Sequence, residues 1–197
     1  MKSYYGSMWS QKGVNTTKIC LMNYLSLGYT INAVTIDGKR GLNTVFKDYP
    51  IQMCHFHQKQ TVQRYITKKP KLQSSKDLQT MMRSLTKVSE KTFRQKIDNW
   101  HNKYEDFLSE YTVNLETGEV VYTHKKLRAA YNSLCSNFDY LFTYRKYKEF
   151  NLPNTTNHLD GGKFADMKNR IRVHRGLSKE LKKKVVDYYA INNGKKS

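Results

Sequence analysis

The sequence predicts an α/β fold with parallel neighbouring strands, followed by a mostly helical region. Two patterns carry this prediction: apolar spacing alternates between helix and strand in the first third of the chain, and helical spacing dominates the middle. At 197 residues and 38% hydrophobic content, the chain is long and apolar enough for one sizeable core. In parallel sheets, functional side chains gather at the carboxyl ends of the strands.

Residues 1–70 are expected to form the α/β layer. Pro50 ends a short helix, Asp37-Gly38 is a turn pair at the end of a strand, and Pro70 breaks the helical pattern. The predicted elements are a helix over Thr16–Gly28, a strand over Ile31–Ile36, a helix over Gly41–Tyr49, a strand over Ile51–Cys54 and a helix over Phe56–Thr67.

Residues 71–150 are expected to form a mostly helical insertion, because apolar residues recur there every three or four positions. A small hairpin turning at Thr117-Gly118 interrupts this pattern. Residues 151–197 begin with a loop, continue with an amphipathic helix that ends near Gly176, and close with a lysine-rich helix.

The charge balance indicates a polyanionic partner. The chain has 35 Lys and Arg against 16 Asp and Glu, a formal net charge of +19. Nucleic acid is favoured over a membrane, because no apolar stretch reaches the roughly 20 residues that a spanning helix needs. No secretory signal follows Met1, so a reducing cytoplasm is expected. The three scattered cysteines argue against a disulfide framework.

Cys54 and His57 form a C-x-x-H pair whose spacing suits two ligands of a zinc ion, and His55 offers a further nitrogen beside them. A closed zinc site needs four ligands, and no second paired motif occurs in the sequence. The alternative is a half-buried cysteine and a hydrogen-bonded histidine at the end of a strand.

Two acidic residues are candidate metal ligands. Asp37 ends a predicted buried strand, which would hold its carboxylate rigidly at the edge of the sheet, although Asp-Gly is also a common turn pair. Asp160 follows Asn157 by three residues, as in a capping box, but Gly161-Gly162 behind it is poor helix sequence and favours close approach of DNA or metal.

Lys and Arg residues near these acids are candidate phosphate contacts, although a series of basic residues on a helix usually forms only a solvent-exposed face. The predicted DNA-binding residues are Lys39, Arg40, Lys163, Lys168, Arg170, Arg172 and Arg175.

The segments Thr35–Leu42, Ile51–Gln58, Thr155–Asp160 and His174–Gly176 together resemble bacterial insertion-sequence transposases of the DDE class that are related to the Mutator superfamily. The resemblance covers nearly the whole chain. It implies a ribonuclease H-like core that is interrupted by a helical insertion, with the chain returning to the core at residues 151–197.

The resemblance also implies roles for individual residues. Asp37 corresponds to the second catalytic acid, Cys54 and His57 to the C-x-x-H pair, and Asp160, supported by Asn157, to the third acid, which is usually Glu in the family. The implied chemistry is DNA cleavage and strand transfer with Mg²⁺ or Mn²⁺. A dimer is expected, because a transposase joins two DNA ends.

The family's first acid lies on an opening strand, and no Asp precedes Asp37 here, so the chain is expected to lack its N-terminal part and to have little cleavage activity alone. Two alternatives stay open: a non-enzymatic nucleic-acid-binding protein held together by zinc at Cys54 and His57, and an inactive transposase remnant.

Overall fold

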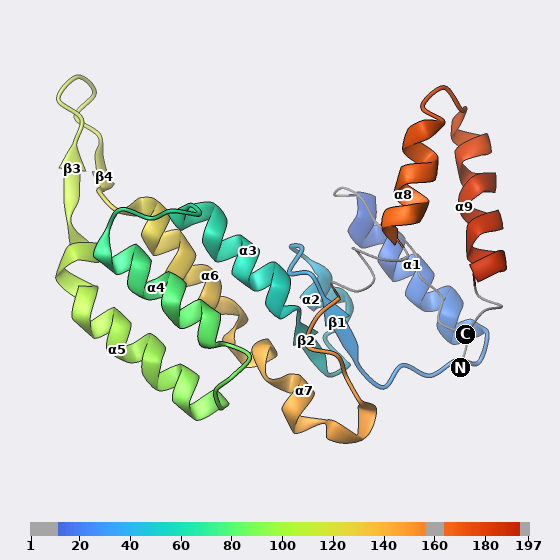
Figure 1. Cartoon of the computed structure of the whole chain (residues 1–197), viewed down its shortest axis with the longest axis horizontal. Helices are drawn as coiled ribbons and strands as arrows, with labels where there is room; N and C mark the ends of the chain where they lie inside the picture. The colour runs from blue at the N-terminus through green and yellow to red at the C-terminus, as the bar shows by residue number, and fades with distance from the viewer. Residues whose placement is uncertain (1–11, 157–163, 194–197) are drawn as a thin grey trace. The chain divides into compact units, whose positions relative to one another are not determined.

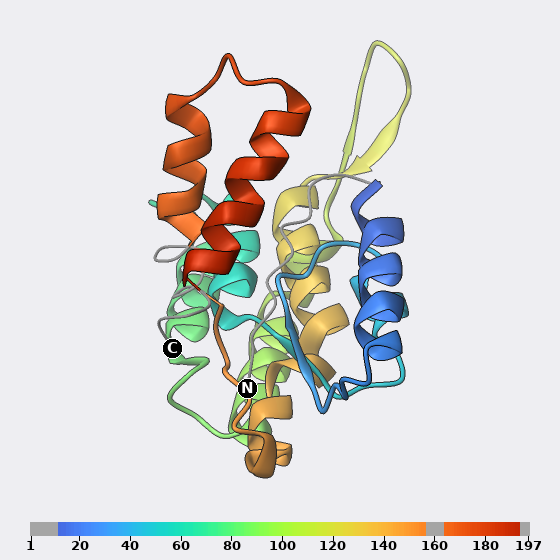
Figure 2. The ribbon, with the colours of Figure 1, turned by 90° about the vertical axis from the view of Figure 1, so that its right-hand side faces the viewer.

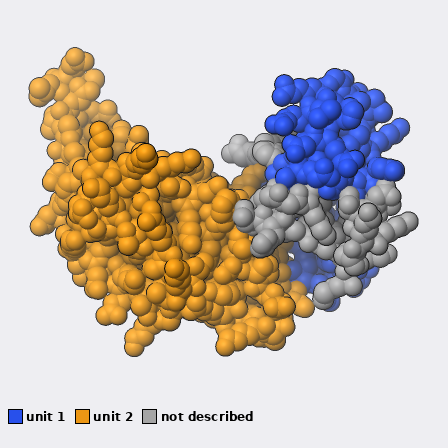
Figure 3. Space-filling model, viewed as in Figure 1, with its two compact units in different colours: residues 1–31, 156–197 blue, residues 32–155 orange. Residues whose placement is uncertain are grey.

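A computed structural model describes residues 12–156 and 164–193 and shows a mixed, helix-rich α/β protein (Figure 1). The chain divides into two compact units, residues 32–155 and residues 1–31 with 156–197 (Figure 3). Unit 2 (32–155) contains β1 (Val34–Ile36), α2 (Leu42–Val45), β2 (Ile51–Met53), α3 (His55–Ile66), α4 (Gln73–Ser84), α5 (Glu90–Ser109), β3 (Tyr111–Val113), β4 (Val120–Tyr122), α6 (Lys125–Leu141), α7 (Thr143–Lys146) and the 3-10 helix η1 (Lys148–Phe150); unit 1 contains α1 (Lys12–Ser26), α8 (Phe164–Val173) and α9 (Lys179–Asn193).

The two strands β1 and β2 pair in parallel, which confirms the predicted pairing. Ile36 lies opposite Met53 in this register, and the chain crosses from one strand to the other through α2. The strand β1 begins later than predicted, because the ladder begins only where the Val34 N–H donates to the Pro50 carbonyl at 2.9 Å. The strand β2 ends one residue earlier than predicted, because Cys54 is the N-cap residue of α3. The helix α2 also ends earlier than predicted, at Val45, and Phe46 is its C-cap residue.

This two-stranded parallel sheet and the antiparallel hairpin are the sheets of the described residues, so the chain is broadly α/β. A larger, ribonuclease H-like sheet stays a prediction.

Four helices, α3 to α6, pack on one another and build most of the core of unit 2. The predicted helical periodicity of this region is confirmed, except that α5 is kinked at Tyr104, where φ is −119°. Ser89 caps α5 by accepting from the Thr92 N–H at 3.1 Å. The buried side chains shared by these helices include Val62, Leu78, Leu85, Phe93, Ile97, Leu134, Leu141 and Phe142.

A buried polar network ties the end of α6 to β2 and α3. The Leu141 carbonyl accepts from Gln52 Nε2 at 3.0 Å and from His55 Nε2 at 2.6 Å. Gln52 Oε1 in turn accepts from the Tyr144 N–H at 2.9 Å. Because Gln52 and His55 are almost completely buried, these bonds form away from water and fix how α6 and α7 meet the sheet.

A second polar contact joins the middle of α3 to α6. Asn137 Nδ2 donates to Gln58 Oε1 at 2.8 Å, and Gln58 Nε2 donates to Ser133 Oγ at 3.3 Å. Gln58 is fully buried, so the two helices have a specified register and not merely an apolar contact.

The hairpin formed by β3 and β4 projects from the helices of unit 2 (Figures 1 and 2). Its turn contains Gly118 with φ of +69°, which confirms the predicted turn at Thr117-Gly118. Every residue from Tyr111 to Val120 is exposed, and Leu115 at the tip is 96% exposed. The hairpin therefore adds little to the core.

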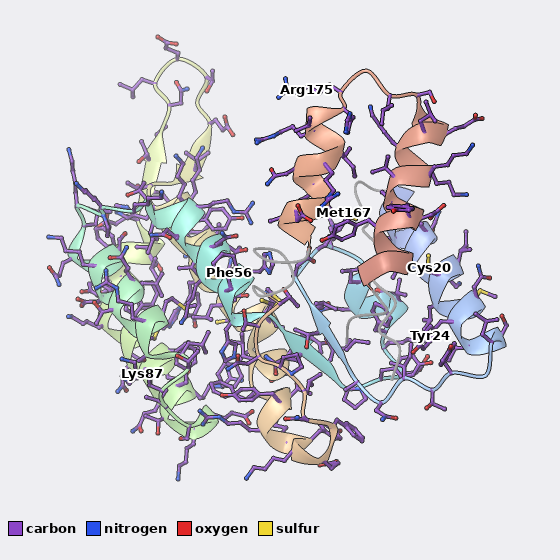
Figure 4. The ribbon with its side chains drawn as sticks, turned by 45° about the vertical axis from the view of Figure 1, so that its right-hand side comes forward. Cys20, Tyr24, Phe56, Lys87, Met167 and Arg175 are labelled. Carbon is purple, nitrogen blue, oxygen red and sulfur yellow. The ribbon has the colours of Figure 1, made fainter. Side chains whose placement is uncertain are left out.

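In unit 1, α8 and α9 lie side by side, joined by a turn at Gly176 (Figure 2). Ser178 Oγ accepts from the Leu181 N–H at 3.3 Å at the start of α9. Met167 on α8 is buried (Figure 4). None of the helices within 12–156 and 164–193 has the length and apolar character needed to cross a membrane.

Gln52→Leu is expected to lower the free energy of unfolding by about 1–3 kcal/mol, because it leaves the half-buried Tyr144 N–H without its acceptor. Urea unfolding followed by circular dichroism measures the change. Gln60→Leu is the matched control, since Gln60 lies on the exposed side of α3, and it should change stability by less than about 0.5 kcal/mol. Equal effects of the two variants would contradict the proposed role of the network.

The stability of unit 2 is expected to fall as the pH drops below about 6.5. Burial lowers the pKa of His55 from 6.5 to about 4, so between these values the unfolded chain binds a proton that the folded chain does not. The loss should reach about 2 kcal/mol between about pH 7 and about pH 4.5. Urea midpoints at the two pH values measure it.

The variant His55→Gln separates this titration from those of the carboxylates. Glutamine can still donate to the Leu141 carbonyl but does not titrate. The pH dependence of stability should therefore be smaller in the variant, and an unchanged pH dependence would show that His55 is not its source.

Candidate functional site

The carboxyl ends of β1 and β2 place the candidate residues at one edge. Asp37 directly follows β1 and Cys54 directly follows β2, and the Cys54 N–H donates to the Ile36 carbonyl at 2.8 Å. Because the strands are parallel, both residues leave the sheet at the same end. The predicted placement of Asp37 near the C-x-x-H pair is confirmed, whereas the roles of these residues stay predictions.

Asp37 is exposed and takes part in a tight turn. Its Oδ1 accepts from the Lys39 N–H at 2.9 Å, which is the side-chain-to-backbone bond of an Asx turn. Its other carboxylate oxygen accepts no hydrogen bond from any residue that the structure describes. The turn function and a ligand function are therefore compatible, because each uses a different oxygen.

Gly38 is required by this turn for two reasons. Its φ is +81°, a conformation that side chains rarely adopt, and a Cβ atom here would lie 2.5 Å from Met53 Cε. Met53 is buried in β2, so it has little room to move. The turn that carries Asp37 is thus packed directly against the neighbouring strand.

The segment that leads to the third predicted acid runs along the same strands. Thr35 Oγ1 donates to the Pro153 carbonyl at 2.9 Å, the His55 N–H donates to the Asn154 carbonyl at 2.9 Å, and Cys54 Sγ lies 3.8 Å from Thr155 Oγ1. These contacts bring a segment about 100 residues distant in the sequence to the strand ends. Asn157, Asp160 and Lys163 lie outside the described residues.

Sequence reasoning missed the contacts of Thr35 and Thr155. Both residues belong to the motifs that carry the family resemblance, but nothing in their local sequence shows which distant segment they meet. A hydroxyl group has too many possible partners for its contact to be predicted from spacing alone.

Cys54 and His57 lie at the start of α3. Cys54 is 0% exposed and His57 is half-buried, with its ring edge-on to that of Phe56 at 5.4 Å (Figure 4 labels Phe56). In the parts of the chain that the structure describes, no three or more His, Cys, Asp or Glu side chains gather in a way that could hold a metal ion. A closed zinc site at this pair would need ligands from elsewhere.

His55 has a structural role through one ring nitrogen, and its suggested role as a further nitrogen ligand beside the pair stays a prediction. Its Nε2 bonds the Leu141 carbonyl, and its ring packs edge-on against Phe142 and Tyr144 at 6.2 and 5.5 Å. These contacts direct the ring toward α6 and α7. The lowered pKa keeps the imidazole neutral near pH 7.

The candidate DNA-binding residues of α8 are exposed but differ in their surroundings. Arg170 Nε pairs with Asp166 Oδ2 at 3.2 Å, and its guanidinium lies 5.7 Å from the Tyr189 ring. Lys168 and Arg172, four residues apart, share another face of the helix. Arg175 follows in the turn after α8 (Figure 4). The charge of Arg170 is thus partly balanced within unit 1.

Beside Asp37, Arg40 is exposed and Lys39 is half-buried. Lys39 donates the backbone hydrogen bond of the Asx turn and Arg40 follows it, so their backbone positions are tied to that of Asp37.

Gly38→Ala is expected to destabilise the protein by about 2–4 kcal/mol, from the positive φ and from the collision with Met53. Gly118→Ala is the matched control: its φ is also positive, at +69°, but a Cβ there would meet nothing within 4 Å. The control should lower the free energy of unfolding only through the strain of the positive φ, by about 1–2 kcal/mol. Thermal and urea unfolding measure both, and equal losses would show that contact with Met53 is unimportant.

The resemblance to transposases rests on the quoted sequence motifs alone. Comparison of the chain with protein-family models, with curated proteins and with solved structures found no match.

Proposed function

We propose that this chain is part of a DNA transposase of the DDE class, Mutator-related, in which Asp37 binds a divalent metal at the carboxyl end of β1. The observation that carries the proposal is the meeting of three segments at one edge: the turn after β1, the C-x-x-H pair after β2, and residues 153–155. The segment with Asp160 follows directly in the sequence. In DDE enzymes the catalytic acids come from separate segments that meet in this way.

The proposal includes a ribonuclease H-like fold. A ribonuclease H-like core would extend the parallel pair β1 and β2 by further strands, and the helices from α4 to α7 would be the insertion between the second and third acids. The parallel order of β1 and β2 and the return of residues 153–155 to the strands support this arrangement.

Asp37 would supply one of the carboxylate ligands that Mg²⁺ or Mn²⁺ needs. These ions prefer carboxylate oxygens, and one oxygen of Asp37 accepts no bond from the described residues. A second carboxylate is needed, and Asp160 is the proposed source. Such ions activate a nucleophile and stabilise the leaving oxygen of a phosphodiester.

The proposed partner is DNA, at transposon ends and target. The net charge of +19 favours a polyanion. Lys39 and Arg40 follow the proposed metal ligand directly, so they would contact phosphates near the cleaved bond. Lys168, Arg172 and Arg175 of unit 1 would contact further phosphates. A dimer is proposed because two DNA ends must be joined.

Iron-directed cleavage of the polypeptide tests the metal site without requiring catalytic activity. Fe²⁺ with ascorbate replaces Mg²⁺ and cuts the backbone near the ion. We expect cuts near Asp37 and near Asp160 in the full chain, both suppressed by excess Mg²⁺. Asp37→Asn should abolish both, because one metal holds both sites in the proposal. Peptide mapping by mass spectrometry identifies the cuts.

Asp48→Asn is the matched control, since Asp48 is an exposed acid between α2 and β2, and it should leave the cuts unchanged. Cuts that persist in Asp37→Asn would overturn the proposed ligand. Zinc bound stoichiometrically through Cys54 and His57, with no Asp37-dependent cleavage, would favour the zinc-stabilised nucleic-acid-binding alternative.

A further inference from the structure

A pocket of about 460 Å³ lies at the end of unit 2 where α3 ends and α4 and α6 begin. One wall is the connection between α3 and α4, and the other is the end of the hairpin together with the first turn of α6. The lining residues used below are Tyr65, Lys69, Lys71, Leu72, Lys125 and Lys126.

The pocket is strongly cationic. Four of its lining residues are lysines, and none is Asp or Glu. The nearby acid Glu110 is engaged by His124, whose Nε2 lies 3.0 Å from Glu110 Oε2. None of the four lysines takes part in an ion pair with the residues that the structure describes. Their positive charges are therefore uncompensated within the pocket.

Two helices present their amino-terminal ends to this pocket. Neither α4 nor α6 has an acidic residue in its first turn, and neither N-cap residue, Leu72 or His124, makes a side-chain capping bond. Lys125 and Lys126 even place positive charge at the positive end of the α6 dipole. An anion in the pocket would relieve this repulsion and accept bonds from the free amide groups.

The walls also contain apolar surface. Tyr65 and Leu72 are large hydrophobic residues that remain substantially exposed beside the lysines. A deoxyribose next to a bound phosphate could lie against them, as sugars do in many backbone contacts. A small inorganic anion would leave this surface uncovered, so the mixed lining favours a nucleic-acid backbone.

We infer that this pocket binds a backbone phosphate of DNA. The inference rests on DNA as the partner in the proposed function but concerns a different site, because the pocket and Cys54 lie at opposite ends of α3. A helix of 12 residues spans about 18 Å. The pocket would hold the duplex away from the proposed metal site and would contribute to affinity without contributing to chemistry.

The test is the salt dependence of binding to a short fluorescent duplex, measured by anisotropy in EDTA so that no metal takes part. Lys125→Gln/Lys126→Gln is expected to weaken binding about 10-fold at low salt and to reduce the slope of log K against log salt by about 1–2. Lys69→Gln/Lys71→Gln should act similarly, because it changes the opposite wall of the same pocket.

Lys91→Gln/Lys96→Gln is the matched control: it removes the same charge from exposed positions on α5, outside the pocket. It should change the slope by less than about 0.5. Equal losses in pocket and control variants would overturn the inference, because DNA would then be held only by net charge. Circular dichroism confirms that each variant is folded.

Titration with pyrophosphate separates a DNA site from a site for a small phosphate compound. Chemical-shift changes at the amides of residues 125–127, together with unchanged DNA affinity in the pocket variants, would also overturn the inference. These measurements do not depend on Asp37, so a negative result in DNA binding would not contradict the proposed metal site. A negative result in iron-directed cleavage would likewise not contradict the phosphate-binding pocket.

Discussion

Unit 2 depends on the carbonyl group at the end of α6. Leu141 is the last residue of that helix, so its carbonyl has no partner within the helix, and Gln52 and His55 supply two donors from β2 and α3. The same Gln52 accepts from the backbone N–H of Tyr144, two residues beyond Phe142. The two hydrogen bonds to this carbonyl thus set the position of α6 against the short parallel sheet. The sheet itself has too few strands to be stable alone.

This arrangement also explains why the edge with Asp37 is well defined despite strands of only three residues. β2 is fixed from one side by α6 and α7 and from the other by β1, and a Cβ at position 38 would collide with the end of the Met53 side chain. The return of residues 153–155 adds bonds from Thr35 and His55 to the same edge. Core packing and the candidate site are therefore parts of one structure.

Much of this could be predicted from sequence because it depends on local patterns. Periodicity identified the helices and the hairpin, and Asp37-Gly38 and Pro50 identified the turns between them. The contacts of Gln52, His55 and Gln58 could not be predicted, since a buried polar side chain finds partners about 75 to 90 residues away that no local pattern encodes. The kink of α5 at Tyr104, whose hydroxyl donates to Asp77 on α4, likewise has no signal in the local sequence.

The hairpin formed by β3 and β4 has a consequence for how this protein can vary. Its strands pair with each other, and the side chains of residues 111–120 are all exposed. Changes in its length or composition would therefore leave the packing of α3 to α6 intact. Among related proteins this tip should differ most in length, and it is the natural place to insert an epitope or a fluorescent group without disturbing the fold.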